Sequence, residues 1–225
     1  MKPVAVVMVS GGMDSCVTAA IASRDHDLAF LHASYGQRTQ AKELACCMAL
    51  ADHFGAARRL HARLDHVTAI GGSSLIDLSW PVPEADPDRR EIPSTYVPFR
   101  NGQILSIAAA WAEALGASSL FIGAVEQDSS GYPDCRREFF DAFELAIRAG
   151  TRPGAAPTIQ TPVIHMRKSA IVARGAELGA PFHLTWSCYR SEEVACGTCD
   201  SCCLRLRAFA EAGVPDPIPY GSTHR

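Results

Sequence analysis

Short apolar runs alternate along the chain with longer stretches in which apolar residues recur every three or four positions. The short runs have the length of buried strands, and the longer stretches have the period of helices that pack on one face. The predicted strands are 4–9, 28–33, 60–64 and 118–123. The predicted helices are 14–24, 101–115, 136–149 and 168–178. One more helix is predicted to begin at Thr39 and to carry Leu44, Cys47, Met48 and Leu50 toward the core. This alternation predicts an α/β fold with a Rossmann-like parallel sheet.

Two stretches fit neither period. Residues 71–94 begin with a pair of glycines and contain four prolines, so they form no single regular element and predict either a long lid or a disordered loop. Residues 150–157 are rich in glycine and proline and are predicted to be a linker.

The size and charge of the chain narrow its class. With 225 residues and 48% hydrophobic content it can bury one substantial core, so we expect a single domain over 1–225. A net charge of −3 disfavours the broad basic face of a nucleic-acid-binding protein. The sequence shows no charged leader and no apolar run near the ~20 residues of a membrane span, so we expect a cytoplasmic protein without nucleic-acid or membrane partners.

The six residues Ser10–Ser15, directly after the first strand, predict a phosphate-binding turn. Paired glycines let the backbone approach an anion, and the first amides of the following helix face that anion. The order matches neither a Walker loop nor a dinucleotide-binding loop, and an ordinary strand-to-helix turn is the alternative. The residues predicted to bind the nucleotide are Val9, Ser10, Gly11, Gly12, Met13, Asp14, Ser15 and, further along, Arg38.

Four cysteines near the C-terminus, Cys188, Cys196, Cys199 and Cys202, have spacings that let their thiolates converge on one tetrahedral ion. We predict one structural Zn²⁺ per chain, held in a subdomain over 186–212, because four sulfurs leave no open coordination position. An iron–sulfur run would place its next cysteine where the chain has Leu206. Free cysteines packed as small apolar residues are the alternative.

The turn resembles the pyrophosphate loop, or PP-loop, of the ATP pyrophosphatase superfamily, whose members adenylate an oxygen of their substrate. Nearly the whole chain is similar to one family within it, the 7-cyano-7-deazaguanine synthases of queuosine biosynthesis. The stretches that carry the resemblance are Ser10–Ser15, Tyr35–Arg38, Pro93–Pro98, Arg100–Asn101, Ser130–Arg136, Thr161–Pro162, Lys168 and the four cysteines. This resemblance implies the adenine nucleotide alpha hydrolase type of sheet.

The resemblance also implies an ATP-dependent ligase that converts 7-carboxy-7-deazaguanine and ammonia into the 7-cyano compound through an amide. It implies Mg²⁺ with the ATP and a zinc-containing homodimer. Adenylation turns the carboxylate oxygen into a leaving group, and the amide oxygen needs the same activation, so one site could serve both steps. The predicted catalytic residues are Asp14, Ser15, Lys168 and Arg100, and the predicted substrate-binding residues are Tyr35, Gln37, Glu126, Asp128, Tyr132 and Asp134.

These assignments have plainer alternatives. Asp134 could cap the helix that follows it, Asp14 could be a helix cap or organise magnesium, and single charged side chains are usually solvated. Phe99, Val125 and Gln127 depart from the small residue, cysteine and threonine expected in the family, which bears on the substrate pocket. For the whole chain the alternatives are a PP-loop tRNA sulfur transferase, disfavoured by the absence of a basic patch, and a non-catalytic nucleotide-binding zinc module.

Overall fold

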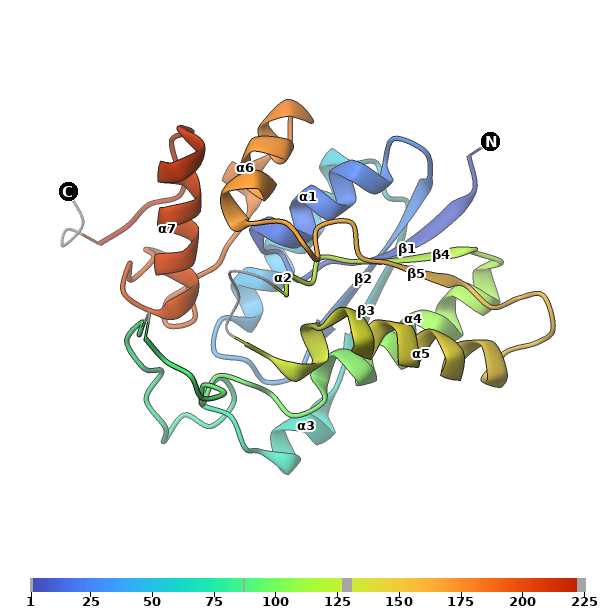
Figure 1. Cartoon of the computed structure of the whole chain (residues 1–225), viewed down its shortest axis with the longest axis horizontal. Helices are drawn as coiled ribbons and strands as arrows, with labels where there is room; N and C mark the ends of the chain where they lie inside the picture. The colour runs from blue at the N-terminus through green and yellow to red at the C-terminus, as the bar shows by residue number, and fades with distance from the viewer. Residues whose placement is uncertain (1, 87, 127–130, 222–225) are drawn as a thin grey trace.

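A computed structural model of the chain describes residues 2–86, 88–126 and 131–221. Five strands form one parallel sheet in the order β3-β2-β1-β4-β5 (Figure 1). Their bounds are β1 Val4–Met8, β2 Asp27–Ser34, β3 Arg58–Arg63, β4 Ser119–Ile122 and β5 Thr158–Gln160. In the central strand β1, Val7 is in register with Phe30 on one side and Phe121 on the other. The predicted parallel α/β sheet is confirmed.

Helices cover both faces of this sheet. Figure 1 shows α1, α2 and α6 on one face and α4 and α5 on the other, with α7 standing outside α6 near the C-terminus. The bounds are α1 Met13–Ala22, α2 Gln40–His53, α3 Asp65–Ile70, α4 Arg100–Leu115, α5 Arg137–Gly150, α6 Lys168–Glu177 and α7 Asp200–Ala212, with the 3-10 turns η1 Pro133–Cys135 and η2 Phe182–Leu184.

The side chains of β1 alternate between two cores. Val6 and Met8 pack with α4 and α5, whereas Val7 and Val9, the residue that follows β1, pack with α1 and α2. Successive strand residues point to opposite faces, so a strand covered on both faces is apolar throughout. This double burial fixes the end of β1, from which the phosphate loop leaves the sheet.

Three elements, α3, β5 and α7, have no counterpart in the predicted pattern. The first two span only 6 and 3 residues, too few for a period to be visible. Helix α7 begins among the cysteines, whose spacing we interpreted as that of metal ligands. The helical spacing of its buried residues Arg205, Ala208 and Phe209 was therefore not recognised.

The described residues of 71–94 contain no helix or strand but pack against the rest of the protein. Leu75, Ile76 and Val82 are buried, and Glu84 forms an isolated bridge with Cys199. The disordered-loop alternative is therefore wrong for these residues, which cover the cysteine-rich segment.

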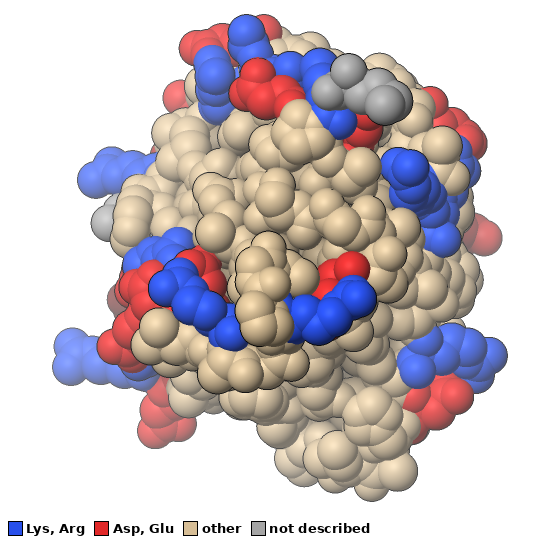
Figure 2. Space-filling view, turned by 90° about the vertical axis from the view of Figure 1, so that its right-hand side faces the viewer, with Lys and Arg blue, Asp and Glu red and all other residues tan. Residues whose placement is uncertain are grey.

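Two properties of the surface follow from the described part of the chain. No helix there is both long and apolar enough to cross a membrane. On the face seen in Figure 2, basic side chains lie beside acidic ones around an uncharged centre.

Candidate functional site

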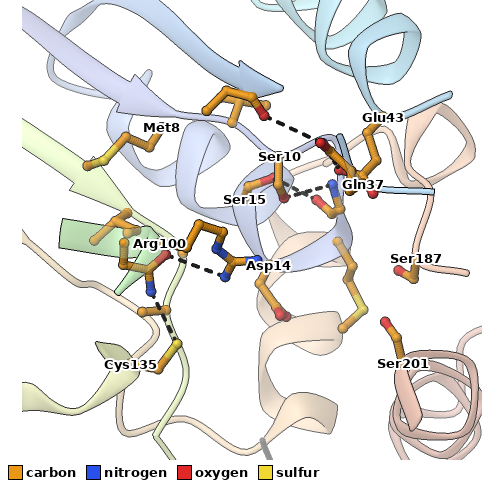
Figure 3. Close-up of a pocket in the computed structure, with 18 of the residues that line it drawn as sticks. Met8, Ser10, Asp14, Ser15, Gln37, Glu43, Arg100, Cys135, Ser187 and Ser201 are labelled. Carbon is orange, nitrogen blue, oxygen red and sulfur yellow. Dashed lines mark hydrogen bonds between the residues drawn. The ribbon is translucent and has the colours of Figure 1, made fainter. Parts of the chain in front are cut away.

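A cavity of about 260 Å³ lies at the carboxyl ends of β1, β2 and β4 (Figure 3). Parallel α/β sheets place their ligand sites at this edge. The predicted site residues that line it are Val9, Ser10, Gly12, Met13, Asp14, Ser15, Tyr35, Gln37, Arg38, Arg100, Tyr132 and Lys168. Gly11, Glu126 and Asp134 lie outside the lining, and Asp128 is outside the described residues. The fold therefore brings most of the predicted residues together.

The phosphate loop is held by its own serines. The Ser15 hydroxyl donates to the Gly12 carbonyl at 2.9 Å, and the Gly12 N–H donates to the Ser10 hydroxyl at 3.2 Å. Gly11 has φ +88°, and a Cβ there would lie 2.5 Å from the Glu43 carbonyl oxygen of α2, so only glycine fits. Gly12 is the N-cap of α1 and has no side chain to cap it, which leaves the first amides available to an anion.

A second glycine, Gly123 at the end of β4, lets the sheet approach α1 closely. A Cβ there would lie 2.8 Å from the carbonyl carbon of Asp14 and 2.9 Å from the backbone nitrogen of Ser15. Since no backbone atom can yield at that distance, β4 sets the position of the first turn of α1.

Asp14 and Lys168 form an ion pair inside the cavity. The Lys168 ammonium lies 2.7 Å from Oδ2 of Asp14, because α6 packs beside α1 and brings its first residue to the phosphate loop. Oδ1 of Asp14 is buried and has no hydrogen-bond partner among the described residues. Asp14 therefore pairs with a cation instead of capping α1, and its second oxygen fits the ligand chemistry of Mg²⁺.

Arg100 begins α4 and reaches the end of β2. Its guanidinium donates to the Tyr35 hydroxyl at 3.0 Å and lies 5.6 Å from the centre of the Tyr35 ring. Burial opposes the charged form, but Tyr35, Cys135 and Asp134 raise the pKa of Arg100 above its usual value. A permanent cation therefore lines the cavity.

Arg38 lines the cavity too, but its guanidinium is bonded elsewhere. It donates to the carbonyls of Ser74 at 2.8 Å and Asp77 at 2.9 Å, and also to that of Trp80. Arg38 thus holds the 74–80 segment beside the cavity, and its predicted contact with phosphate stays a prediction that these bonds do not support.

Two tyrosines that line the cavity, Tyr132 and Tyr189, come from segments far apart in the chain. The Tyr132 hydroxyl lies 2.9 Å from Oγ1 of Thr95, and its ring centre lies 5.6 Å from that of Tyr96. Tyr189, which sequence reasoning missed, lines the same cavity, and burial together with contact with Tyr132 raises its pKa. The result is an aromatic wall suited to a planar heterocycle.

Asp134 has a role in the fold. Its Oδ2 accepts the Asn101 N–H at 2.9 Å, and the Asn101 amide donates back to the Asp134 carbonyl at 2.9 Å. Asp134 therefore caps α4, which precedes it in the chain, and the alternative of a cap on the following helix is wrong. Glu126 is exposed, with Oε2 lying 3.6 Å from the His165 ring nitrogen. The substrate contacts of both carboxylates stay predictions.

Glu43, in the first turn of α2, is a cavity residue that the sequence pattern did not reveal. One carboxylate oxygen accepts the Thr39 hydroxyl at 2.8 Å, and the other accepts the Gln37 amide at 2.9 Å. Burial raises the pKa of Glu43. Acidic residues are common in the first turn of a helix, because they interact favourably with the helix dipole. The position of Glu43 in the sequence therefore did not indicate a functional role.

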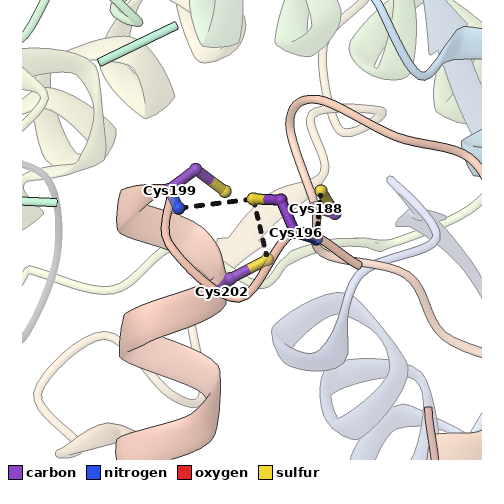
Figure 4. Close-up of side chains that lie close together, drawn as sticks. All are labelled: Cys188, Cys196, Cys199 and Cys202. Carbon is purple, nitrogen blue, oxygen red and sulfur yellow. Dashed lines mark hydrogen bonds between the residues drawn. The ribbon is translucent and has the colours of Figure 1, made fainter. Parts of the chain in front are cut away.

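The sulfur atoms of the four cysteines converge, as Figure 4 shows. All lie within 4.8 Å of one another, and those of Cys196 and Cys202 are 3.9 Å apart. A tetrahedron with Zn–S bonds of about 2.3 Å has edges of about 3.8 Å, so the four residues fit such an ion. Bonds from neighbouring thiols and from the Cys196 and Arg190 N–H groups hold the pKa of Cys188 well below its usual value, which favours the thiolate.

The cysteine segment forms one wall of the cavity. Its lining residues are Trp186, Ser187, Tyr189, Ser201, Leu204 and Arg205, which lie beside or between the cysteines. Arg205 is 1% exposed and donates to both carboxylate oxygens of Asp216 at 2.9 Å, to Thr185 at 2.8 Å and to Ser187 at 3.3 Å. This buried network ties α7 to the wall of the cavity.

Comparison with known proteins assigns the family. The sequence model of the family described as "Queuosine biosynthesis protein QueC" matches residues 4–213. The chain belongs to the QueC family. It is 56% identical over 217 residues to the 7-cyano-7-deazaguanine synthase of Chlorobium phaeobacteroides and 55% identical over 220 residues to that of Acidobacterium capsulatum, covering 96% of both chains in each case. This QueC family member is therefore an enzyme.

Among solved structures, the fold of this QueC family member is similar to that of the U34-tRNA thiolase NcsA from Methanococcus maripaludis with its [4Fe-4S] cluster. The TM-score is 0.51 at 11% sequence identity, over 93% of this chain and 65% of that one. At this identity the likeness shows a shared fold alone.

Proposed function

We propose that this QueC family member converts 7-carboxy-7-deazaguanine and ammonia into 7-cyano-7-deazaguanine, consuming ATP for each oxygen removed. The observation that carries the proposal is that the phosphate loop and the aromatic wall around Tyr132 line one and the same cavity. The synthase names of relatives that cover 96% of the chain support the same reaction.

The phosphate loop and its cations would bind and polarise the nucleotide. The free amides of α1 and the hydroxyls of Ser10 and Ser15 suit the pyrophosphate, and Asp14 would hold Mg²⁺ through its unpaired oxygen. Bound Mg²⁺ neutralises phosphate charge. Lys168 and Arg100 are fixed by Asp14 and Tyr35, so they are preorganised to stabilise charge that develops as pyrophosphate leaves.

The two activations are chemically parallel. In the first, a carboxylate oxygen attacks the α-phosphorus of ATP, and ammonia then displaces AMP from the acyl carbon to give the amide. In the second, the amide oxygen attacks ATP in the same way, and loss of AMP and of the N–H protons leaves the nitrile. Both use the same loop and the same heterocycle, so one cavity serves both.

The aromatic wall would hold the deazaguanine ring. Tyr132 and Tyr189 support stacking, and Tyr35 and Gln37 line the same cavity near Arg100. The predicted contacts of Glu126, Asp128 and Asp134 with the base edge remain part of this proposal.

We assign the metal as one structural Zn²⁺ held by Cys188, Cys196, Cys199 and Cys202. When bound, it supplies a crosslink between the segment around Cys188 and the start of α7. The cavity wall lies on both sides of that crosslink, so the metal would fix the shape of the pocket. A single domain with a metal-binding part at 186–212, a homodimer and a cytoplasmic location belong to the same proposal.

The test is a mass-spectrometric assay with 7-carboxy-7-deazaguanine, ammonium and Mg-ATP. The proposal predicts the amide and then the nitrile, with AMP and pyrophosphate. Asp14→Ala should abolish turnover and leave the melting temperature nearly unchanged, because Asp14 serves the nucleotide and not the core.

The two other function classes predict different results. A tRNA sulfur transferase would consume ATP only with tRNA and a sulfur donor, and a binding module would bind ATP without turnover. Zinc-replete protein that binds ATP but converts neither acid nor amide would overturn the proposed reaction.

A further inference from the structure

Among the described residues, two acidic side chains line the cavity, Asp14 and Glu43. They differ in the groups that bind them. Asp14 is neutralised by the Lys168 ammonium at 2.7 Å. Glu43 accepts hydrogen bonds from the neutral groups of Gln37 and Thr39, and no Lys, Arg or His of the described residues forms an ion pair with it. The charge of Arg100, which lines the same cavity, acts on Glu43 without forming an ion pair with it. The cavity therefore holds a carboxylate with which a cationic ligand would form an ion pair that the protein itself does not make.

Glu43 also lies beside the phosphate loop. Its carbonyl oxygen abuts Gly11, where even a Cβ would come within 2.5 Å, so the first turn of α2 is packed onto the loop. Figure 3 shows Glu43 and Gln37 together on the side of the cavity that carries Ser10. A group bound to this carboxylate would therefore lie on the phosphate-loop side of the cavity.

The bonds to Gln37 and Thr39 fix the carboxylate without neutralising it. Each oxygen accepts one bond at 2.8 or 2.9 Å and keeps a further lone pair free. A fixed carboxylate with spare acceptor sites suits a small cation with several N–H donors. Of the reactants in the proposed reaction, ammonium is the one with that chemistry.

We propose that Glu43 binds the ammonium ion and accepts its proton in the step that forms the amide. The inference rests on the proposed function. Glu43 takes one proton from NH₄⁺, and the lone pair of NH₃ forms the C–N bond at the acyl carbon of the adenylate. The C–O bond to AMP breaks with its electrons on AMP, a second N–H proton passes to the AMP phosphate, and Glu43 returns its proton to water.

The competing role for Glu43 is magnesium binding at the pyrophosphate. The two roles separate cleanly, because both half-reactions need Mg-ATP and only the first needs ammonium. Conversion of the 7-amide into the nitrile with ATP and no ammonium is therefore the internal control.

The experiment compares wild type, Glu43→Gln and Glu192→Gln in both half-reactions. Glu192 is the matched control because it accepts the backbone N–H of Lys42 beside Glu43 and does not line the cavity. For Glu43→Gln we expect kcat/KM for ammonium in the acid reaction to fall by about 10²-fold or more. Its rate with the amide, and both rates of Glu192→Gln, should stay close to wild type.

Any other outcome would overturn either the role proposed for Glu43 or the proposed function. Equal loss of both half-reactions in Glu43→Gln, at an unchanged melting temperature, would assign Glu43 to the nucleotide or its magnesium. Equal loss with a lowered melting temperature would assign it to the fold. Unchanged kinetics would remove Glu43 from the reaction, and a wild type inactive on both substrates would refute the proposed function itself.

Discussion

Mild acid should destabilise the protein through His32 on β2. This side chain is 1% exposed, and its Nδ1 lies 2.8 Å from the Val9 carbonyl, where β1 passes into the phosphate loop. Its Nε2 is buried without a partner among the described residues, and the His61 ring lies 5.7 Å away. Protonation would place an unpaired charge in the protein interior.

The magnitude follows from the pKa. Burial lowers the pKa of His32 from 6.5 to about 4, so the unfolded chain binds a proton between these values that the folded protein excludes. This contribution to stability is full above pH 6.5 and is lost as the pH falls toward 4. Linkage gives a loss of about 2 kcal/mol at about pH 5 and about 3 kcal/mol in full.

The assay is urea unfolding at about pH 7.5 and about pH 5 for wild type, His32→Gln and the exposed control His183→Gln. Between these pH values, wild type and His183→Gln should each lose about 2 kcal/mol more unfolding free energy than His32→Gln. Weaker metal binding in acid affects all three alike and cancels. Equal pH dependence in wild type and His32→Gln would refute the reasoning.

Two further predictions concern the tail. Arg205→Met leaves Asp216 buried without its cation and should lower the unfolding free energy by about 3–5 kcal/mol. In the control Arg207→Met, which changes a half-exposed arginine, the loss should be under about 1 kcal/mol. Equal melting temperatures for the two variants would contradict this prediction. Cys196→Ser should abolish stoichiometric metal binding and lower the melting temperature, whereas Cys203→Ser, whose thiol lies outside the four-sulfur cluster, should keep about one metal ion per chain by elemental analysis. Metal lost from both variants, or from neither, would defeat the ligand assignment.

Much of the fold could be predicted because local signals agree with it. The apolar run of β1 must be buried on both faces, and Ser10–Ser15 follows it at the edge where α/β sites lie. The spacing of the four cysteines is itself a distance constraint, so their convergence needed no knowledge of the rest of the chain.

The contacts that the sequence did not reveal join segments far apart in the chain. Glu43, Tyr189 and Arg205 reach the cavity only through the packing of α2 and of the cysteine segment. Asp134 caps a helix that begins 34 positions before it, at Arg100, which no local rule anticipates.

The structure shows how Phe99 fits at a position where a small residue was expected. Phe99 is the one non-glycine residue with positive φ in the described part of the chain, at 53°, at a position where the sequence resemblance led us to expect a small residue. The Phe99 ring covers Gly102 so closely that a Cβ on Gly102 would lie 2.3 Å from the ring. The centre of the Phe99 ring lies 5.8 Å from that of Phe139, in an edge-to-face arrangement. These contacts offset the strain of the left-handed backbone.

The most direct test of the central claim is to supply synthetic 7-amido-7-deazaguanine with Mg-ATP and no ammonium. The amide already contains the nitrogen, so a site that adenylates each oxygen in turn must still produce the nitrile, with one AMP formed for each molecule converted. Nitrile and AMP in equal amounts are the predicted result. Zinc-replete protein that binds ATP yet leaves the amide unchanged, while turning the acid into the nitrile, would contradict the claim that the amide is adenylated in its own right.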